Sequence, residues 1–458
     1  MMNRTKKDFY IEFVRLAVPI VGLEVLSTSV NLLSSLMVGQ LGEQAIVSVG
    51  FCNQFFQMFT MIIFGITNGT AIFTSQYWGK KDFSGIRQMV MLSLILTEIL
   101  AVIFFLVCQL KPWWILGVFT ENPEILEIGC KYIRIVSWNY LLSTAIYTCN
   151  VLLKCTEKAK YALISSIVSI TTDIIVSYLL IFGIGKWKGM GVYGAAIGIC
   201  IAKTVELTLV LGLIFGKVPF MRTKLWEVFK IPKTFFPEYI RTVLPVILNL
   251  TLYGVGTMLY NAVYGRTSTE SVAAINIMEV IGNCSKIFML GAAGAASVIV
   301  GREIGAGKIK EAYQEGIWLS RISPVVGIIC SGCFAILTPF IIRFYNVSPE
   351  VKIVTTHLMI LLMVSVIFET CNHIGLVGVL KSGGDSFFNF VVDTMGVWGI
   401  SLPLLFLTGI ILHLNIEIVY GMSLIEIVIK SFVVRHRIRK CHWARNLVGN
   451  QKEEEKNE

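Results

Sequence analysis

The strongest constraint on the fold is an internal repeat that relates the second half of the sequence to the first. When the chain is shifted along itself so that Arg15 falls on Arg241, other residues that shape the backbone coincide without a gap: Pro19 with Pro245, Gly39 with Gly265, Gly65 with Gly291, Gly79 with Gly305 and Gln88 with Gln314. We call this displacement the repeat shift. A period this long, with a hydrophobic segment around each matched proline or glycine, indicates duplication of a whole half-protein.

The composition places both halves in a membrane. Of the 458 residues, 55% are hydrophobic and 15% are charged, and the mean hydropathy is +0.73. The length accommodates about a dozen spans of ~20 residues. Duplicated halves in such an apolar chain are a common plan for secondary transporters, in which one half moves against the other around a shared site.

Apolar runs bounded by charge, glycine or proline predict twelve membrane helices. In the first half they cover about residues 12–38, 46–76, 89–110, 128–153, 161–183 and 191–215. In the second half they cover about residues 242–264, 272–300, 317–342, 353–380, 388–412 and 416–434. The runs do not alternate with a period of two, which excludes a β-barrel. The predicted fold is therefore an all-α polytopic membrane protein with two pseudo-symmetric six-helix lobes.

The predicted domains follow from this division. They are an N-terminal lobe over residues 1–216, a linker in the cytoplasmic membrane interface over 217–236, a C-terminal lobe over 237–434, and a basic then acidic cytoplasmic tail over 435–458. Lys and Arg concentrate in alternate loops and in the linker, so we expect both termini in the cytoplasm and the chain in the inner cell membrane.

The charge of +10 is therefore interpreted as topological, and we also expect it to attract anionic lipid headgroups. The basic residues are dispersed over loops, which argues against a nucleic-acid partner. No Walker A sequence, dinucleotide fingerprint or HExxH motif occurs, and the CxxC of Cys330 and Cys333 lies in an apolar run. We expect no enzyme activity, no structural metal and no cofactor apart from a coupling sodium ion or proton.

Ionisable residues at membrane depth are the candidate functional groups, because each costs at least ~2.5 kcal/mol there. Asp173 is the first candidate, since the hydroxyls of Thr171, Thr172 and Ser177 are within one helical turn and suit a proton or sodium site. Glu24 follows Pro19, which frees a backbone carbonyl.

The second half offers its own candidates. Glu369 and His373 are four residues apart and share a helix face. Asp393 is interpreted mainly as a helix-packing residue. Three further sets are expected to neutralise each other: Lys203 with Glu206, Lys430 with Glu426, and Glu279 with Lys286. Glu98 has no evident partner.

Four segments carry a family resemblance: residues 37–43 (MVGQLGE), 181–183 (IFG), 301–308 (GREIGAGK) and 380–385 (LKSGGD). In this order and spacing they resemble the multidrug and toxic compound extrusion (MATE) transporters. The resemblance implies a V-shaped fold of twelve helices around a central cavity. It also implies export of organic, cationic or amphipathic compounds by sodium- or proton-coupled antiport. Because one chain contains both lobes, we expect it to function as a monomer.

The coupling residues depart from the family pattern. The aspartate that many relatives carry in the first helix is Ser34 here, so that role falls to Glu24. In the fifth helix the family's Asn and Asp places read Asp173 and Ser177, and Asn150 adds a polar group from helix four. These residues favour coupling in the first lobe, with Glu369 and His373 as the alternative. The expected cavity residues are Asn31, Asn249, Tyr253, Tyr260 and Asp393.

Other functions are less well supported. A lipid-linked oligosaccharide flippase of the same superfamily would line its cavity with several Arg or Lys, whereas this chain has Lys203, Lys286 and Arg321 at depth. An enzyme would need a clustered nucleophile or metal set. A channel would need a filter-like repeat.

Overall fold

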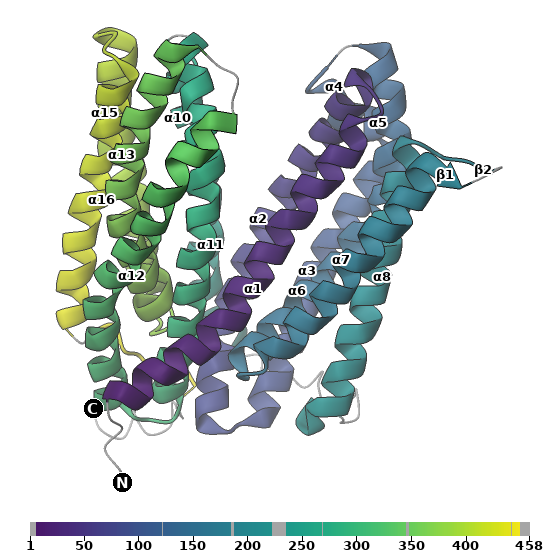
Figure 1. The fold of residues 1–458 in the computed structure, drawn as a ribbon. Coiled ribbons are helices and arrows are strands. Elements are labelled where there is room, and N and C mark those ends of the chain that lie inside the picture. Colours follow the sequence, from purple (N-terminus) through teal and green to yellow (C-terminus); the bar gives the residue numbers. More distant parts are fainter. Residues whose placement is uncertain are drawn as a thin grey trace. The chain divides into compact units, whose positions relative to one another are not determined.

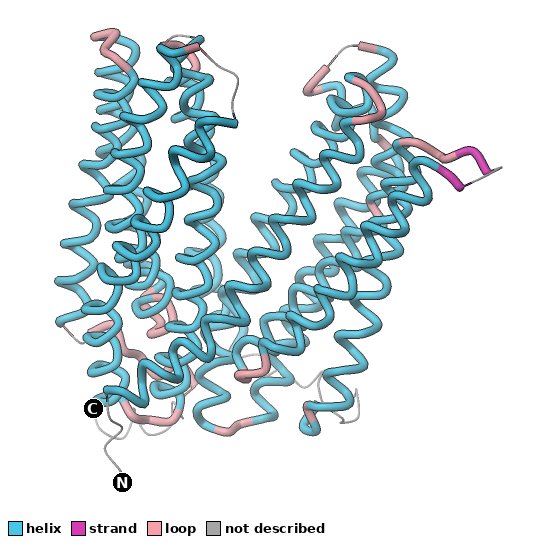
Figure 2. The backbone as a smooth tube through the Cα atoms, in the orientation of Figure 1, coloured by secondary structure: helices cyan, strands magenta, loops and turns pink. Residues whose placement is uncertain are grey.

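The computed structural model describes residues 6–120, 122–184, 187–221, 235–267, 269–344, 348–440 and 442–448. Figure 2 shows that helices dominate these residues. The strands among them are β1 (Gly183–Ile184) and β2 (Trp187–Lys188), an antiparallel hairpin in which Gly183 pairs with Lys188. Most of the predicted linker and the end of the predicted tail, after Val448, lie outside the described residues.

Each predicted span in the first half coincides with a helix or a pair of helices (Figure 1). These are α1 (Lys6–Gly39), α2 (Glu43–Lys80), α3 (Phe83–Leu110), α5 (Pro123–Val136) with α6 (Trp138–Cys155), α7 (Ala159–Phe182) and α8 (Val192–Lys217). Short helices α4 (Pro112–Gly117) and η1 (Pro219–Met221) lie at the ends of α3 and α8.

The second half repeats this order. Its elements are α10 (Phe235–Tyr264), α11 (Thr269–Gly305), α12 (Ile309–Phe344), α13 (Pro349–Asn372) continued by the π-helix η2 (His373–Leu380), then α14 (Ser386–Thr394), η3 (Met395–Ser401), α15 (Leu402–Leu405) and η4 (Phe406–Ile411) in one run, and α16 (Ile416–Arg439). The predicted all-α fold is confirmed. Within the described residues, nine helices are long and apolar enough by themselves to cross a membrane.

Helices in the two halves also start at positions that the repeat shift relates. Helices of the first half have counterparts that begin one repeat shift later: α2 at Glu43 and α11 at Thr269, α3 at Phe83 and α12 at Ile309, α5 at Pro123 and α13 at Pro349. The N-caps agree as well. Asn122 and Ser348 each precede a proline at the first helical position, and the side chain of each accepts a hydrogen bond from a backbone N–H of the first turn.

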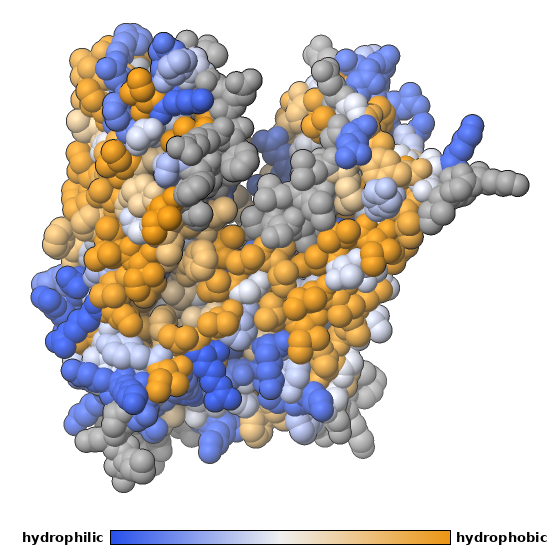
Figure 3. All heavy atoms as spheres, viewed as in Figure 1, coloured by the Kyte–Doolittle hydropathy of each residue, from blue (hydrophilic) through white to orange (hydrophobic). Residues whose placement is uncertain are grey.

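The helices form two compact units. The N-terminal unit comprises Gly22–Thr74 and Asp82–Ile240, and the C-terminal unit comprises Met1–Val21, Ser75–Lys81 and Arg241–Glu458. Helices α1 and α2 therefore contribute residues to both units. Figure 3 shows hydrophobic side chains over the middle of the helices and hydrophilic ones at their ends, as a lipid-facing surface requires.

Each unit has its own hydrophobic core. In the N-terminal unit, the rings of Phe59 and Tyr140 stack at 4.9 Å between centroids, and both side chains are fully buried. In the C-terminal unit, Leu358, Leu405 and Val419 are fully buried where α13, α15 and α16 meet. Helices α7 and α8 lie side by side in the first unit, as do α13 and α16 in the second (Figure 1).

Within the C-terminal unit, the ends of α2 and α11 cross at glycines. A Cβ atom on Gly79 would lie 1.8 Å from the carbonyl oxygen of Arg302, and one on Gly305 would lie 1.7 Å from that of Gln76. Only glycine permits this backbone approach. Arg302 also forms an ion pair of 2.6 Å with Glu12 of α1, which attaches the start of α1 to α11.

The chain after α16 forms a strap, residues 442–448, on the same end of the C-terminal unit. Trp443 is fully buried against Gly316 and Gly383, and the Arg445 N–H donates to the Gly383 carbonyl at 2.8 Å. The strap also bonds α2. The side-chain amide of Gln76 donates to the Arg445 carbonyl at 3.1 Å and accepts from the Leu447 N–H at 2.8 Å.

We predict that Trp443→Ala lowers the free energy of unfolding by about 3–5 kcal/mol, the usual cost of emptying a buried aromatic site. Thermal melting of the purified protein measures the effect. Truncation after Lys440 should lower the melting temperature as well, whereas truncation after Val448 removes no described contact and serves as the control. Equal melting temperatures for both truncations would contradict a structural strap.

Candidate functional site

Asp173 lies midway along α7 in the interior of the N-terminal unit, with 5% of its surface exposed. The Ser177 hydroxyl, one turn later, donates a hydrogen bond of 2.8 Å to its Oδ1 atom. Gly198 of α8 packs against this hydroxyl, since a Cβ atom there would lie 2.1 Å from Ser177 Oγ. The sequence places a glycine where α8 must leave room for the Asp173–Ser177 pair.

The threonines beside Asp173 donate their hydroxyl hydrogens to backbone carbonyls and not to Asp173. The Thr171 hydroxyl donates to the Ile167 carbonyl at 2.9 Å, and the Thr172 hydroxyl donates to the Val168 carbonyl at 2.8 Å. A threonine in a helix readily bonds the carbonyl four residues earlier, so spacing along the helix did not decide where these hydroxyls point.

A second charged group lies nearby on α8. Lys203 Nζ is 2.8 Å from Glu206 Oε2, which confirms the predicted pair. The Ser166 hydroxyl of α7 donates to Glu206 Oε1 at 2.9 Å, and the charge of Asp173 acts on Lys203. The two helices α7 and α8 therefore bring one ammonium group and two carboxylates into each other's electrostatic reach.

Other predicted residues of this unit are less central. Glu24 forms an ion pair of 3.6 Å with Lys154, and both side chains are about one-third exposed, so the pair contributes little to stability. Glu98 does have a partner, because the Thr144 hydroxyl donates to it at 2.6 Å. Asn150 is only partly buried, but its Oδ1 atom is buried and has no hydrogen-bond partner among the described residues. The side chains of Asn31 and Ser34 lie outside what the structure describes.

The C-terminal unit contains a larger ionic cluster. Lys430 Nζ on α16 is 2.5 Å from Glu426 Oε1 and 3.0 Å from Asp393 Oδ1 on α14. The Asn249 amide of α10 donates to Asp393 Oδ2 at 2.9 Å. The predicted Lys430–Glu426 pair is confirmed. Asp393 is held by residues of two other helices, which sequence spacing did not indicate.

Glu369 and His373 lie near this cluster. The charges of Lys430 and Glu426 act on Glu369, and those of Asp393 and Lys430 act on His373. Tyr253 of α10 is also within electrostatic reach of Asp393 and Lys430. Tyr260, two helical turns later on α10, packs against the hydrophobic core of the unit.

The predicted pairing of Glu279 with Lys286 is not formed among the described residues. Lys286 Nζ instead hydrogen-bonds Asn283 Oδ1 at 3.3 Å. Asn283 is three residues away and faces the same side of α11, whereas Glu279 is two turns away, beyond the spacing at which helical side chains meet best.

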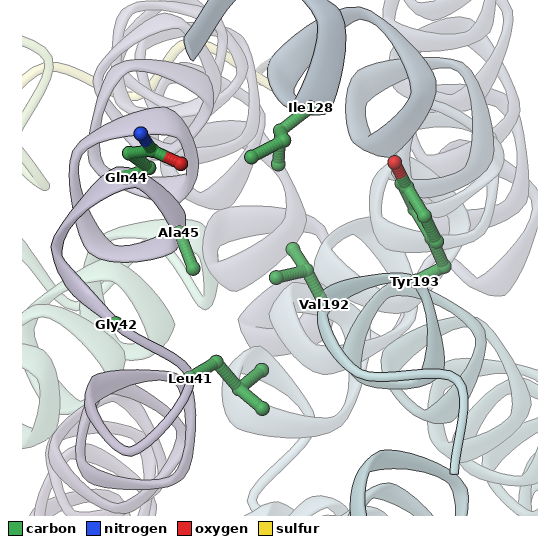
Figure 4. A pocket seen from close by; sticks show the side chains of 7 residues that line it. All are labelled: Leu41, Gly42, Gln44, Ala45, Ile128, Val192 and Tyr193. Atoms are coloured by element: carbon green, nitrogen blue, oxygen red, sulfur yellow. The ribbon is translucent and has the colours of Figure 1, made fainter. Parts of the chain in front are cut away.

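A pocket of about 470 Å³ lies elsewhere in the N-terminal unit. Figure 4 shows its lining, which comes from the α1–α2 turn, the start of α2, α5 and the start of α8: Leu41, Gly42, Gln44, Ala45, Ile128, Val192 and Tyr193. These lining residues carry no charge. They include none of the predicted cavity residues.

Known proteins identify the kind of molecule to which these clusters belong. The family model MatE matches residues 19–179 and 245–407, two ranges whose starts are one repeat shift apart. The chain belongs to this family of membrane transporters.

Individual relatives of this MATE family member are distant. The uncharacterized transporter YisQ of Bacillus subtilis is 21% identical over 89% of this chain and 90% of its own length. The probable multidrug resistance protein YoeA of the same organism is 22% identical over 85% and 84%. The Vibrio cholerae MATE transporter VcmN in its bent form has 17% identity and a TM-score of 0.85 over 95% of this chain and 97% of its own, which shows the shared fold.

In this MATE transporter, Gly198→Ala is predicted to cost about 1–3 kcal/mol of stability, because the added methyl group overpacks against Ser177. Displacing the Ser177 hydroxyl also removes the hydrogen bond to Asp173, so transport should fall. Gly212→Ala in the same helix is the matched control, since among the described residues nothing beyond its own stretch of helix lies within 4 Å of its Cβ position. Thermal melting and vesicle transport measure both variants; equal behaviour would mean that α8 does not position Ser177.

Proposed function

We propose that the protein exports organic cations or amphipathic compounds by sodium- or proton-coupled antiport with alternating access. Membership of the MATE family and the similarity to YoeA, a probable multidrug resistance protein, support export of drug-like compounds. The observation that carries the coupling proposal is Asp173, a buried carboxylate on a helix of membrane-spanning length, hydrogen-bonded by the Ser177 hydroxyl.

The chemistry of this site suits a coupling ion. A carboxylate in a low dielectric takes up a proton or a hard cation more readily than one in water. Ser177 holds Asp173 Oδ1 in one orientation, and its hydroxyl oxygen is itself a ligand of the kind that sodium prefers. Protonation or sodium binding removes the negative charge from the interior of the N-terminal unit, which changes the electrostatic field on Lys203 and its partner Glu206.

Flippase activity is the less favoured alternative. A pyrophosphate-carrying lipid needs cationic side chains that are available to it. Lys203 and Lys430 are each bonded to a carboxylate, and Lys286 is bonded to an amide. The charges of Lys203 and Lys430 are thus compensated within the protein and are not available to a pyrophosphate. This favours a cation over a pyrophosphate as the cargo.

Two helices run from one unit into the other, and a bend in such a helix would let the units move. Helix α1 passes from one unit to the other after Val21 and α2 after Thr74. Pro19 lies two residues before the first of these points and removes a helical hydrogen bond there. We propose that α1 bends at this place during transport. We also propose that the protein works as a monomer in the cell membrane, with both termini in the cytoplasm.

We predict that Asp173→Asn abolishes gradient-driven transport while the protein remains folded. Purified protein in vesicles, with an imposed sodium or proton gradient and ethidium as the fluorescent cation, measures this. Glu98→Gln is the control, because Glu98 is a hydrogen-bonded carboxylate of the same unit on another helix. Full transport by Asp173→Asn, together with loss in Glu369→Gln, would place coupling in the C-terminal unit.

A further inference from the structure

The two ionic clusters occupy counterpart helices of the repeat. The repeat shift takes α7 onto the α14–η4 run and α8 onto α16. Each unit carries an aspartate on the first of these helices, Asp173 or Asp393. Each also carries a lysine and a glutamate on the second, and the shift brings Lys203 next to Lys430 in the sequence. The same three charged groups are therefore present twice, although their individual positions differ.

In the C-terminal unit, the lysine bonds both carboxylates. The side chains of Glu426, Lys430 and Asp393 are 6%, 9% and 18% exposed, so the cluster is well removed from solvent and Asp393 is its most accessible member. One ammonium group between two carboxylates leaves a formal charge of −1. Removing one partner of a buried ionic set is costly because the remaining charges lose their compensation.

We propose that Lys430 is a built-in competitor in a cation-binding site formed by Asp393, Glu426 and Asn249. The positive charge of an organic cation takes the place of the Lys430 ammonium group at the two carboxylates. This rests on the proposed transport of organic cations. Binding at this site is an exchange of one cation for another, so its strength is the difference between two similar interactions, and the bound cation is released readily.

The surroundings provide a place for the displaced ammonium group. Glu369 of α13 lies within electrostatic reach of Lys430, and α13 packs beside α16. A lysine ammonium sits on a flexible four-carbon stem and can swing between acceptors without backbone movement. The other titratable groups within electrostatic reach of the cluster include His373 of η2, Lys381 just after η2, and Tyr253 and Tyr260 of α10. Lys286 of α11 acts on Glu369 and His373.

Aromatic side chains next to the cluster suit an organic cation. Tyr253 is one turn after Asn249 on α10 and is 44% exposed. The Trp398 indole N–H donates to the Leu252 carbonyl at 3.3 Å, which places its ring against the same part of α10. Aromatic faces attract cations that have left water, with about 0.5–2 kcal/mol per contact. Asp393 therefore has hydrogen-bonding and aromatic neighbours together.

The test is equilibrium binding of ethidium to purified full-length protein, followed by fluorescence polarisation. Lys430→Met removes the competitor and should lower the Kd for ethidium at least about tenfold, equivalent to about 1.4 kcal/mol. Lys430→Arg keeps the charge and should bind like the wild type. Lys308→Met is the matched control, since it removes an ammonium group of the same unit that is paired with a carboxylate outside the cluster, that of Glu303 at 3.4 Å.

A folded Lys430→Met variant with unchanged or weaker ethidium binding overturns the proposal. If that variant does not fold, Lys430→Met with Glu426→Gln restores the original formal charge of the cluster. This double variant should bind ethidium about as tightly as the wild type, and ethidium should no longer bind when Asp393→Asn is added. Ethidium binding that survives all three changes also overturns the proposal.

The outcome separates this inference from the proposed function. If the wild type transports ethidium and Lys430→Met gains no affinity, the competitor role is wrong and organic-cation transport stands. If the wild type moves no organic cation but Lys430→Met binds ethidium tightly, the site exists and the proposed function is wrong.

Discussion

The crossing of α2 and α11 is the contact on which the rest of the C-terminal unit depends. Gly79 faces the carbonyl of Arg302 and Gly305 faces that of Gln76. The repeat shift exchanges the members of these contacts, so they are two copies of one interaction. Any side chain at either glycine would separate the helices, and with them Arg302, its partner Glu12 and the start of α1.

Much of the fold could be predicted from the sequence, because a membrane forces long apolar runs to be helices and the repeat relates one half to the other. The site was less predictable. Pairs along one helix, such as Lys203 with Glu206, follow from spacing. The contact of Asp393 with Lys430 and Asn249 joins three helices and depends on packing that no local pattern encodes. The hydroxyls of Thr171 and Thr172 show a limit of local spacing, since they donate to carbonyls of their own helix and not to the neighbouring Asp173.

The buried charged residues follow the duplication by helix but not by position. Residue by residue the buried charges do not coincide, yet both units hold an aspartate, a lysine and a glutamate on counterpart helices. The glycines of the helix crossing recur at matching positions of the repeat. The charged residues recur only on matching helices, at different positions. Under the proposed mechanism, one cluster binds the coupling ion and the other binds the cargo.

The strap has a consequence for how the protein is made. The backbone N–H of Leu447 bonds the side chain of Gln76, although the two residues lie far apart in the sequence. During synthesis the end of α2 is made well before its partners in the strap, because Gln76 and Leu447 are 371 residues apart. The polar side chain of Gln76 therefore remains without these bonds until the strap has been translated. A segment that follows α16 thus closes the end of a helix that was made much earlier.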